Sequence, residues 1–299
     1  MLGSIERSRP LYPFRIGDIY YMIEIKYGPE IEDIRNFMEV LSVHKKVVFI
    51  TTSSRSPYVE KFGESPKSSQ LARHIAQKLK ERDVAVDVID ASKLTIHNCL
   101  GCVSEIHGNN CGAKESLLKD SEKNPNGKLR CWASHDFEDD ELWKISKAIY
   151  ESQAVIFFGS QRWGSVNAIY QKVIERLDWI ENMHTTLGEE NSVKDIQAGL
   201  VVIGQNWRVA DSIDTQKKTL EYFGFQTPDP LFIGWQYTRD SNEESPESYR
   251  NAPDTFEQSW NMKLFRWEKK KGTELSTDKK PNESKFLVFK DFLNEIKNL

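Results

Sequence analysis

Serine, glutamine and arginine side chains that can bind an anion gather in the stretch TTSSRSPYVEKFGESPKSSQ, residues 51–70. The candidate donors are Ser53, Arg55, Ser68, Ser69 and Gln70. Backbone N–H groups at a helix start, with hydroxyl and guanidinium donors beside them, can bind a phosphate dianion. The stretch has neither a Walker motif nor the GxGxxG spacing, which argues against a nucleoside triphosphate or a Rossmann dinucleotide. The alternative is a serine-rich turn with an ordinary helix N-cap.

Two later stretches combine tryptophan, arginine, amides and glycine directly after apolar runs. The candidate binding residues are Ser160, Gln161, Arg162, Trp163, Gly164 and Ser165 in the first stretch, and Gly204, Gln205, Asn206 and Trp207 in the second. Tryptophan offers an apolar wall for a flat ring, glycine lets the backbone approach closely, and arginine can balance negative charge. The pattern predicts a site for a planar, partly polar ligand. The alternative is a pair of surface turns whose tryptophans pack on neighbouring helices.

All four cysteines lie between residues 99 and 131. Cys99, Cys102, His107 and Cys111 fall one residue short of a Cys-Cys-His-Cys zinc knuckle, and tetrahedral zinc accepts such ligands. An iron–sulfur cluster needs four well-placed thiolates. We favour a third interpretation, in which the cysteines are partly buried thiols in a loop beside the ligand, and we predict no metal site. The sequence shows no obvious catalytic histidine or glutamate, and we assign no catalytic residue.

Apolar runs and amphipathic segments alternate between about residues 45 and 240. The runs expected to form strands are 45–53, 84–91, 153–160, 196–204 and 229–237, and the segments expected to form helices are 68–83, 139–152, 164–184 and 211–225. Acidic residues are expected in the first turn of the second helix, where the helix dipole favours them. Strands that are apolar throughout, separated by helices, indicate a parallel sheet covered on both faces.

The alternation therefore predicts an α/β fold, a flavodoxin-like doubly wound five-stranded parallel sheet of order 2-1-3-4-5, with N- and C-terminal extensions. Ligands of such sheets bind outside the carboxyl ends of the strands, where all three candidate stretches would meet. We expect an N-terminal extension at 1–44, the flavodoxin-like domain at 45–240 and a helical extension at 241–299. The extensions are expected to pack on the core or on a second subunit.

The composition limits the class of protein. The formal net charge of −4 gives no reason to expect a nucleic acid or an anionic membrane as partner. No window approaches the length of a membrane helix, and the first residues lack the apolar core of a secretory signal. Four cysteines are too few for a disulfide scaffold in a chain of 299 residues, so we expect a cytoplasmic protein.

Over residues 45–240 the sequence resembles the NADPH-dependent FMN reductase family of flavodoxin-like NAD(P)H:flavin oxidoreductases. ITTSSR followed by SPKSSQLA resembles the family's phosphate loop, and DDELWKISKAIYESQAVIFFGSQRWGSVNAIYQKVIERLD resembles its central segment. Thr52 stands where the family usually has glycine, and Gln161 where it has proline. Residues 56–67 make the phosphate loop longer than usual, and this insertion either covers the phosphate or interrupts the site. Cys99 and Cys102 resemble the C-x-x-C opening of iron–sulfur relatives, but Glu105 stands where a further cysteine is expected.

The resemblance implies an enzyme that holds FMN non-covalently and uses NADPH or NADH as cosubstrate. Its phosphate would bind the residues of the first stretch, and its ring would lie between the second and third stretches. Hydride would pass to the bound FMN and electrons then to a small-molecule acceptor, such as a quinone, azo dye, nitroaromatic, metal ion or free flavin. Relatives commonly form homodimers or homotetramers. The alternatives are a flavodoxin-like electron carrier, a non-catalytic flavin-fold binding protein and, less favoured, a zinc- or iron–sulfur-containing flavoprotein.

Overall fold

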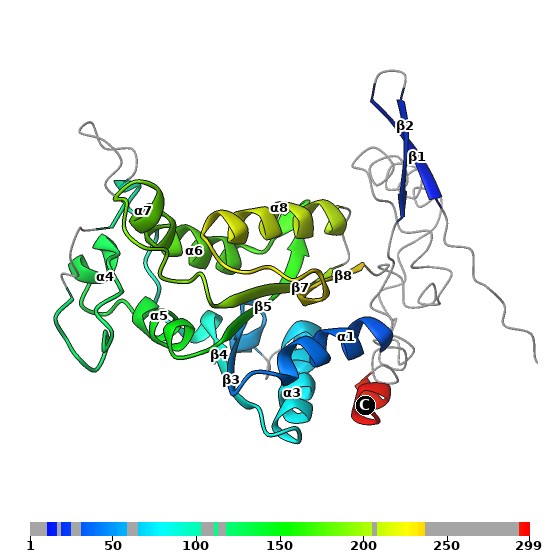
Figure 1. Ribbon diagram of the computed structural model, residues 1–299, viewed down its shortest axis with the longest axis horizontal. Coiled ribbons are helices and arrows are strands. Elements are labelled where there is room, and N and C mark those ends of the chain that lie inside the picture. The colour runs from blue at the N-terminus through cyan, green and yellow to red at the C-terminus, as the bar shows by residue number, and fades with distance from the viewer. Residues whose placement is uncertain are drawn as a thin grey trace, which may run out of the picture.

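A predominantly parallel β-sheet forms the centre of the protein (Figure 1). The computed structural model describes residues 11–16, 19–24, 31–58, 65–102, 111–112, 118–204, 208–236 and 293–299. The parallel strands are β3 (Lys46–Thr51), β4 (Ala85–Asp90), β5 (Ala154–Arg162), β7 (Gln197–Gly204) and β8 (Phe232–Gln236). Their order is β4-β3-β5-β7-β8, and the short β6 (Ser165–Val166) pairs antiparallel with β5. This is the predicted 2-1-3-4-5 order, so the fold is flavodoxin-like.

Helices connect the strands. They are α1 (Ile31–Ser42), α3 (Lys67–Lys80), α4 (Trp132–Asp136), α5 (Leu142–Tyr150), α6 (Ala168–Leu177), α7 (Trp179–Thr185) and α8 (Val209–Tyr222). Single 3-10 turns form η1 (Ser56–Tyr58), η2 (Ala91–Lys93) and η4 (Asp229–Leu231). Near the N-terminus, β1 (Leu11–Ile16) and β2 (Ile19–Glu24) form a separate antiparallel pair. Within the helical extension expected at 241–299, residues 293–297 are helical and residues 241–292 lie outside the described residues.

Two hydrophobic cores lie on opposite faces of the sheet. Successive side chains of a strand point to opposite faces, so Val48 and Ile50 belong to one core and Val47 and Phe49 to the other. The first core is completed by α5, α6, α7 and α8. The second is completed by α1, α3 and the terminal segment 293–299, whose Ile296 is fully buried. Figure 1 shows α1 and α3 on one side of the sheet, with α6 and α8 on the other.

Three local predictions were wrong. The helix expected over 164–184 is β6 followed by α6 and α7, which meet at Asp178. The helix expected over 139–152 begins at Leu142, so its acidic residues precede the first turn rather than occupy it. The short helix α4 was not predicted at all. In the first two cases, strand pairing and tertiary hydrogen bonds described below involve residues that helix propensity would have placed on the helix.

Tyr170 is a buried phenol in the first core. The side chain is fully buried, its ring meets Phe157 edge-on, and its hydroxyl has no hydrogen-bond partner among the described residues. A buried hydroxyl without a partner loses its hydrogen bonds to water on folding and gains none within the protein, so its burial costs free energy. We therefore expect Tyr170→Phe to leave the free energy of unfolding unchanged or to raise it by up to about 1 kcal/mol, as measured by urea denaturation. A loss of stability beyond measurement error would show that the hydroxyl has a partner.

Candidate functional site

The carboxyl ends of β3, β5 and β7 lie side by side. Thr51 pairs with Phe158, Ser160 pairs with Ile203, and Gln161 pairs with Gly204. A Cβ atom at position 204 would lie 2.1 Å from the Gln161 Cβ, so only glycine allows this approach of β7 to β5. The ends of two strands that carry candidate residues, β5 and β7, are therefore in direct contact at the edge where doubly wound sheets bind ligands.

Asn167 joins the ends of β3 and β5. Its side-chain amide donates to the Thr52 carbonyl at 2.6 Å and accepts from the Ser160 backbone N–H at 3.0 Å. The Thr52 hydroxyl lies 3.1 Å from the same amide oxygen. From sequence, Asn167 would be taken for a helix N-cap, because it directly precedes α6; yet its side chain makes no capping bond. Asn167 is therefore a buried residue that joins two strand ends at the site, and sequence reasoning missed this role.

The second candidate stretch forms a tight hairpin. Gln161 pairs with Val166 and Arg162 with Ser165, leaving Trp163 and Gly164 as the two-residue turn. Their φ angles of 50° and 77° are left-handed, as a type I′ hairpin requires. The Trp163 side chain is 77% exposed, so its indole stands at the rim rather than in the core.

The hairpin is anchored to α8. The Gln161 side-chain amide donates to the Arg208 carbonyl at 3.2 Å and to the Ser212 hydroxyl at 2.9 Å. The Ser212 hydroxyl in turn lies 3.1 Å from the Gly164 carbonyl. Gln161, predicted to line a ring, therefore has its amide nitrogen directed toward α8 and holds the turn in place. Arg162 and Trp163 are exposed at the tip of this anchored turn.

The first candidate stretch spans the end of β3 and the start of α3. Ser53 is buried, and its hydroxyl accepts from the Arg55 N–H at 3.4 Å. Ser68 and Ser69 lie in the first turn of α3, where backbone N–H groups have no partner within the helix. The Gln70 side chain donates to the Ser65 carbonyl at 2.7 Å, so it supports the loop itself.

Two buried hydroxyls at this edge have unused hydrogen-bonding capacity. Ser69 is 2% exposed and Ser160 9% exposed, and neither side-chain oxygen has a hydrogen-bond partner among the described residues. One lies at the helix start and the other at the end of β5. Buried polar atoms of this kind ordinarily meet a partner, which can be a ligand or a bound water.

A buried ion pair fixes the loop that follows β4. Arg176 of α6 and Asp140 have side chains with no solvent exposure and are joined by bonds of 2.8 and 3.0 Å. Asp140 also accepts from the Ser134 hydroxyl and the His97 backbone N–H, and Arg176 donates to the His97 carbonyl at 2.7 Å. Lys172, one turn earlier on α6, donates to the Ile96 carbonyl. Residues 96 and 97 are thus held by two side chains of the helix that follows the hairpin.

The pKa of Asp140 reflects this pairing. Burial acts to raise it, but hydrogen bonds and charge from Arg176, with help from Ser134 and the His97 N–H, hold the pKa below its ordinary value. Sequence reasoning missed the pair. The available signal was that Arg176 lies three residues after Val173 and four before Ile180, on the apolar face of its helix.

The structure places some predicted site residues together and leaves others untested. Ser160, Gly164 and Gly204 lie at the joined ends of β5 and β7, and Ser53 lies two residues after β3. Ser165 accepts a bond from Gln171 next to the turn of the hairpin. Gln205, Asn206, Trp207 and residues 59–64 of the 56–67 insertion lie outside the described residues.

The cysteine loop is described only in part. His107, one of the four residues of the zinc-knuckle pattern, lies outside the described residues. Among the residues that the structure describes, no three histidine, cysteine or acidic side chains form a group suited to a metal ion. The described helices also include none that is long and apolar enough to cross a membrane.

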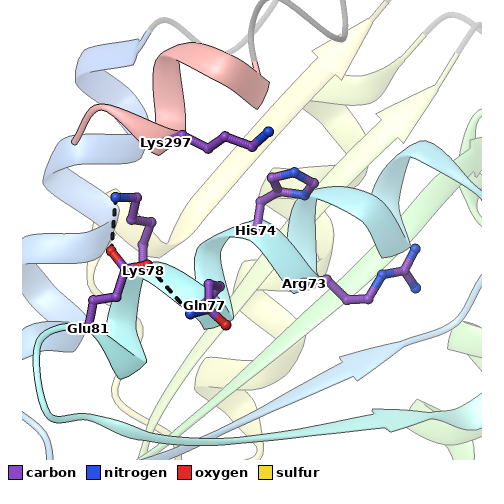
Figure 2. Close-up of a pocket in the computed structure, with 6 residues that line it drawn as sticks. All are labelled: Arg73, His74, Gln77, Lys78, Glu81 and Lys297. Atoms are coloured by element: carbon purple, nitrogen blue, oxygen red, sulfur yellow. Dashed lines mark hydrogen bonds and ion pairs between the residues drawn. The ribbon is translucent and has the colours of Figure 1, made fainter.

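A separate hollow of about 370 Å³ lies between α3 and the terminal segment (Figure 2). It is lined by Arg73, His74, Gln77, Lys78, Glu81 and Lys297. Lys78 and Glu81 pair with each other at 2.9 Å. Its lining residues are all polar or charged, and none is a phenylalanine, tyrosine or tryptophan that could stack on a flat ring. It contains none of the predicted site residues and starts beyond the first turn of α3.

No protein-family model and no curated protein matches the sequence. Solved structures with a similar fold include RosB with a bound 8-demethyl-8-formylriboflavin-5'-phosphate intermediate, at 10% identity and a TM-score of 0.47, covering 79% of this chain and 91% of that one. A putative quinone reductase from Klebsiella pneumoniae has 14% identity and a TM-score of 0.43, with coverages of 69% and 79%. An NADH:FMN oxidoreductase in its apo form has 12% identity and a TM-score of 0.40, with coverages of 78% and 91%. At these identities the similarity assigns no residue and no activity to this chain.

Proposed function

We propose that this flavodoxin-like protein is an FMN-dependent NAD(P)H oxidoreductase. The observation that carries the proposal is a pair of buried hydroxyls that have no hydrogen-bond partner among the described residues, Ser69 at the start of α3 and Ser160 at the end of β5, on the edge where such sheets bind ligands. The first suits a phosphate and the second a polar atom of a ring. The sequence resemblance to FMN reductases supports the same ligand.

The residues at the sheet edge fit FMN in their chemistry. At the start of α3, the backbone N–H groups and hydroxyls of Ser68 and Ser69 would hold the phosphate, together with Ser53 and Arg55 from the loop after β3. The helix dipole adds partial positive charge at the same place. These residues offer many hydrogen-bond donors and no carboxylate, so they suit a phosphate dianion better than a neutral ligand.

The ring would lie against the anchored hairpin. Trp163 offers an aromatic surface at the rim, and Gly164 leaves room for close approach of the ring to the backbone. Ser160 would donate to a ring heteroatom, and Gly204 would contribute backbone from β7. Arg162, exposed beside Trp163, would balance negative charge on the reduced ring. Gln161, Asn167 and Ser212 hold these groups in position rather than bind the ligand.

Bound FMN would supply the redox chemistry, accepting a hydride from NAD(P)H and passing electrons to a small-molecule acceptor. The protein's part is to orient the ring, exclude water from its buried side and stabilise charge. A hydride transfer needs no general acid or base, which is consistent with the scarcity of titratable side chains among the candidate residues. The residues assigned here would therefore bind FMN and orient its ring.

The proposal is tested by the visible absorption spectrum. We expect the purified, FMN-loaded protein to show flavin bands that bleach when NADPH or NADH is added without oxygen and return when a quinone is supplied. A protein that binds FMN but is not reduced by either nicotinamide would be an electron carrier or binding protein. A protein that does not bind FMN would remove the flavin assignment altogether.

Ser69→Ala tests the phosphate assignment. We expect it to weaken FMN binding about 10- to 100-fold, because a hydrogen bond to a charged group is worth about 1.5–3 kcal/mol. Riboflavin, which lacks the phosphate, should bind the variant and the parent equally. The measurement is fluorescence titration with both flavins.

Ser152→Ala is the matched control. Ser152 is also buried, and its hydroxyl also has no partner among the described residues, but it precedes β5 at the opposite edge of the sheet. Replacement of Ser152 should leave the affinities for FMN and for riboflavin unchanged. Equal losses in the two variants, or an equal loss of riboflavin binding in Ser69→Ala, would contradict a phosphate contact at Ser69.

A further inference from the structure

We propose that Cys131 and Cys111 form a peroxide-reactive pair, which hydrogen peroxide converts into an intramolecular disulfide. Neither residue belongs to the proposed flavin site, and the proposal does not require bound flavin. It stands on the setting of Cys131, on the contact between the two segments that carry the cysteines, and on the difference in their accessibility.

Cys131 lies against the buried guanidinium of Arg176. The Arg176 Nε donates to the Cys131 sulfur at 3.2 Å. The other nitrogens of Arg176 donate to Asp140, Ser134 and the His97 carbonyl, so the guanidinium cannot turn away from the sulfur without breaking those bonds. A guanidinium N–H stabilises an anionic sulfur, the form that attacks peroxides. Cys131 is also only half-buried, so a small oxidant can reach it.

Cys111 is held in the neighbouring segment. A Cβ atom at Gly112 would lie 3.6 Å from the Arg130 Cβ and 3.5 Å from the Arg130 carbonyl oxygen, so residues 112 and 130 are in contact. Their sequence neighbours are Cys111 and Cys131. The Asn182 side chain bonds the Cys111 carbonyl and fixes this segment to α7. Both cysteines pack in the same hydrophobic core.

The two thiols differ in a way that gives each a role. Cys111 is 9% exposed, and burial, followed by the nearby Asp178 carboxylate and the other cysteines, raises the pKa of its thiol. It is therefore a poor first target for an oxidant in solution. Its thiol lies near the Asp178 carboxylate. Cys131 would react first, and Cys111 would resolve the product.

The chemistry balances with hydrogen peroxide as the oxidant. The Cys131 sulfur attacks one peroxide oxygen, the O–O bond breaks, and the released hydroxide takes a proton to become water, leaving a sulfenic acid. The Cys111 sulfur then attacks the Cys131 sulfur, the S–O bond breaks, and the second oxygen leaves as water after taking the Cys111 proton. Two thiols and one peroxide thus become one disulfide and two waters.

The test uses the full chain, fully reduced and then freed of reductant. After treatment with hydrogen peroxide, remaining thiols are alkylated and the protein is digested and mapped by mass spectrometry. We expect loss of two of the four thiols, a peptide pair linked through Cys111 and Cys131, and full recovery with dithiothreitol. A link through Cys99 or Cys102 instead, oxidation of Cys131 without any link, or no oxidation of Cys131 would overturn the proposal.

Two variants and a control assign the order of events. In Cys111→Ser, Cys131 should accumulate as a sulfenic acid that dimedone traps. In Cys131→Ser, Cys111 should stay a thiol at the same peroxide concentration. Cys102→Ser is the control and should still form the Cys111–Cys131 link. Oxidation of Cys111 in the absence of Cys131 would contradict the assigned roles, and the map of the unmutated protein decides the question if a variant fails to fold.

Discussion

The Asp140→Asn variant is expected to lose about 3–5 kcal/mol of unfolding free energy, because it leaves the buried Arg176 guanidinium without its counter-charge. Asp140 accepts two bonds from Arg176 and others from Ser134 and the His97 N–H, and neither member of the pair is exposed. Domains are typically stable by only about 5–15 kcal/mol, so the loss would bring the protein close to unfolding. Urea denaturation followed by far-ultraviolet circular dichroism measures it.

Asp139→Asn is the matched control. Asp139 is adjacent in sequence and pairs with the His97 ring at 2.7 Å, but its side chain is 69% exposed. Exposed ion pairs contribute about 0–1 kcal/mol to stability, so the free energy of unfolding of the control should fall by no more than about 1 kcal/mol. Equal losses in the two single variants would contradict the role assigned to Asp140.

The same pair predicts a pH dependence. The pKa of Asp140 in the folded protein lies below the ordinary value of 3.8, so the folded state holds this carboxylate ionised more firmly than the unfolded state does. The stabilisation is complete above the ordinary value and is lost as the pH falls through the lower, folded-state pKa. The loss of unfolding free energy in Asp140→Asn should therefore shrink at the acid end of a urea titration series.

Asn167→Ala is expected to lower the free energy of unfolding by about 2–4 kcal/mol and to weaken flavin binding at least about tenfold. The change leaves the Ser160 N–H and the Thr52 carbonyl without the partner that joins them at 3.0 and 2.6 Å. Each buried polar group left without a partner costs about 1–3 kcal/mol. Because these bonds also hold the ends of β3 and β5 together, the candidate site should open at the same time.

Asn126→Ala provides the comparison. Asn126 is exposed, and its side chain accepts a single bond, 3.1 Å long, from the Lys128 N–H in a surface turn. It should lose less than about 1 kcal/mol and bind FMN as the parent does. Urea denaturation and flavin titration of both variants provide the measurement. If Asn167→Ala lost stability but kept its flavin affinity, the strand ends would not belong to the binding site.

The fold was predictable because its signal is repeated. Apolar runs long enough for buried strands alternate with segments of helical period, and β3, β4, β5 and β7 begin or end within a few residues of the expected positions. The turn between β5 and β6 was missed although its signal was present. Glycine at the second position of a two-residue loop, as in Trp163-Gly164, is typical of a type I′ hairpin. The expected long helix there was wrong because the hairpin's pairing with β5 competed with helix propensity.

The position of the candidate site was predictable from the sequence, but the residues that hold it in place were not. Ser160 and Gly204 end two of the predicted strands and Gly164 comes soon after the first of them, so the rule for doubly wound sheets places them at one edge. Asn167, Arg176 and Asp140 gave no comparable signal, because their partners are distant in the sequence: 115 positions separate Asn167 from Thr52, and 36 separate Arg176 from Asp140. Gln161 was predicted to line the ring, and the Arg208 carbonyl and the Ser212 hydroxyl at the start of α8 engage its amide nitrogen.

The amino-acid sequence by itself was sufficient to predict the five parallel strands, their order and the edge at which polar residues collect, since those properties depend on periodicity and on how the chain connects successive strands. Tertiary structure alone decided which polar side chains bond the protein and which have no partner among the described residues. That choice depends on competition among distant partners for each buried donor and acceptor. The hydroxyls of Ser69 and Ser160 have no partner among the described residues. In contrast, the side chains of Asn167 and Arg176 bond the backbone carbonyls of Thr52 and His97 and so hold the strand end and the loop after β4 in place.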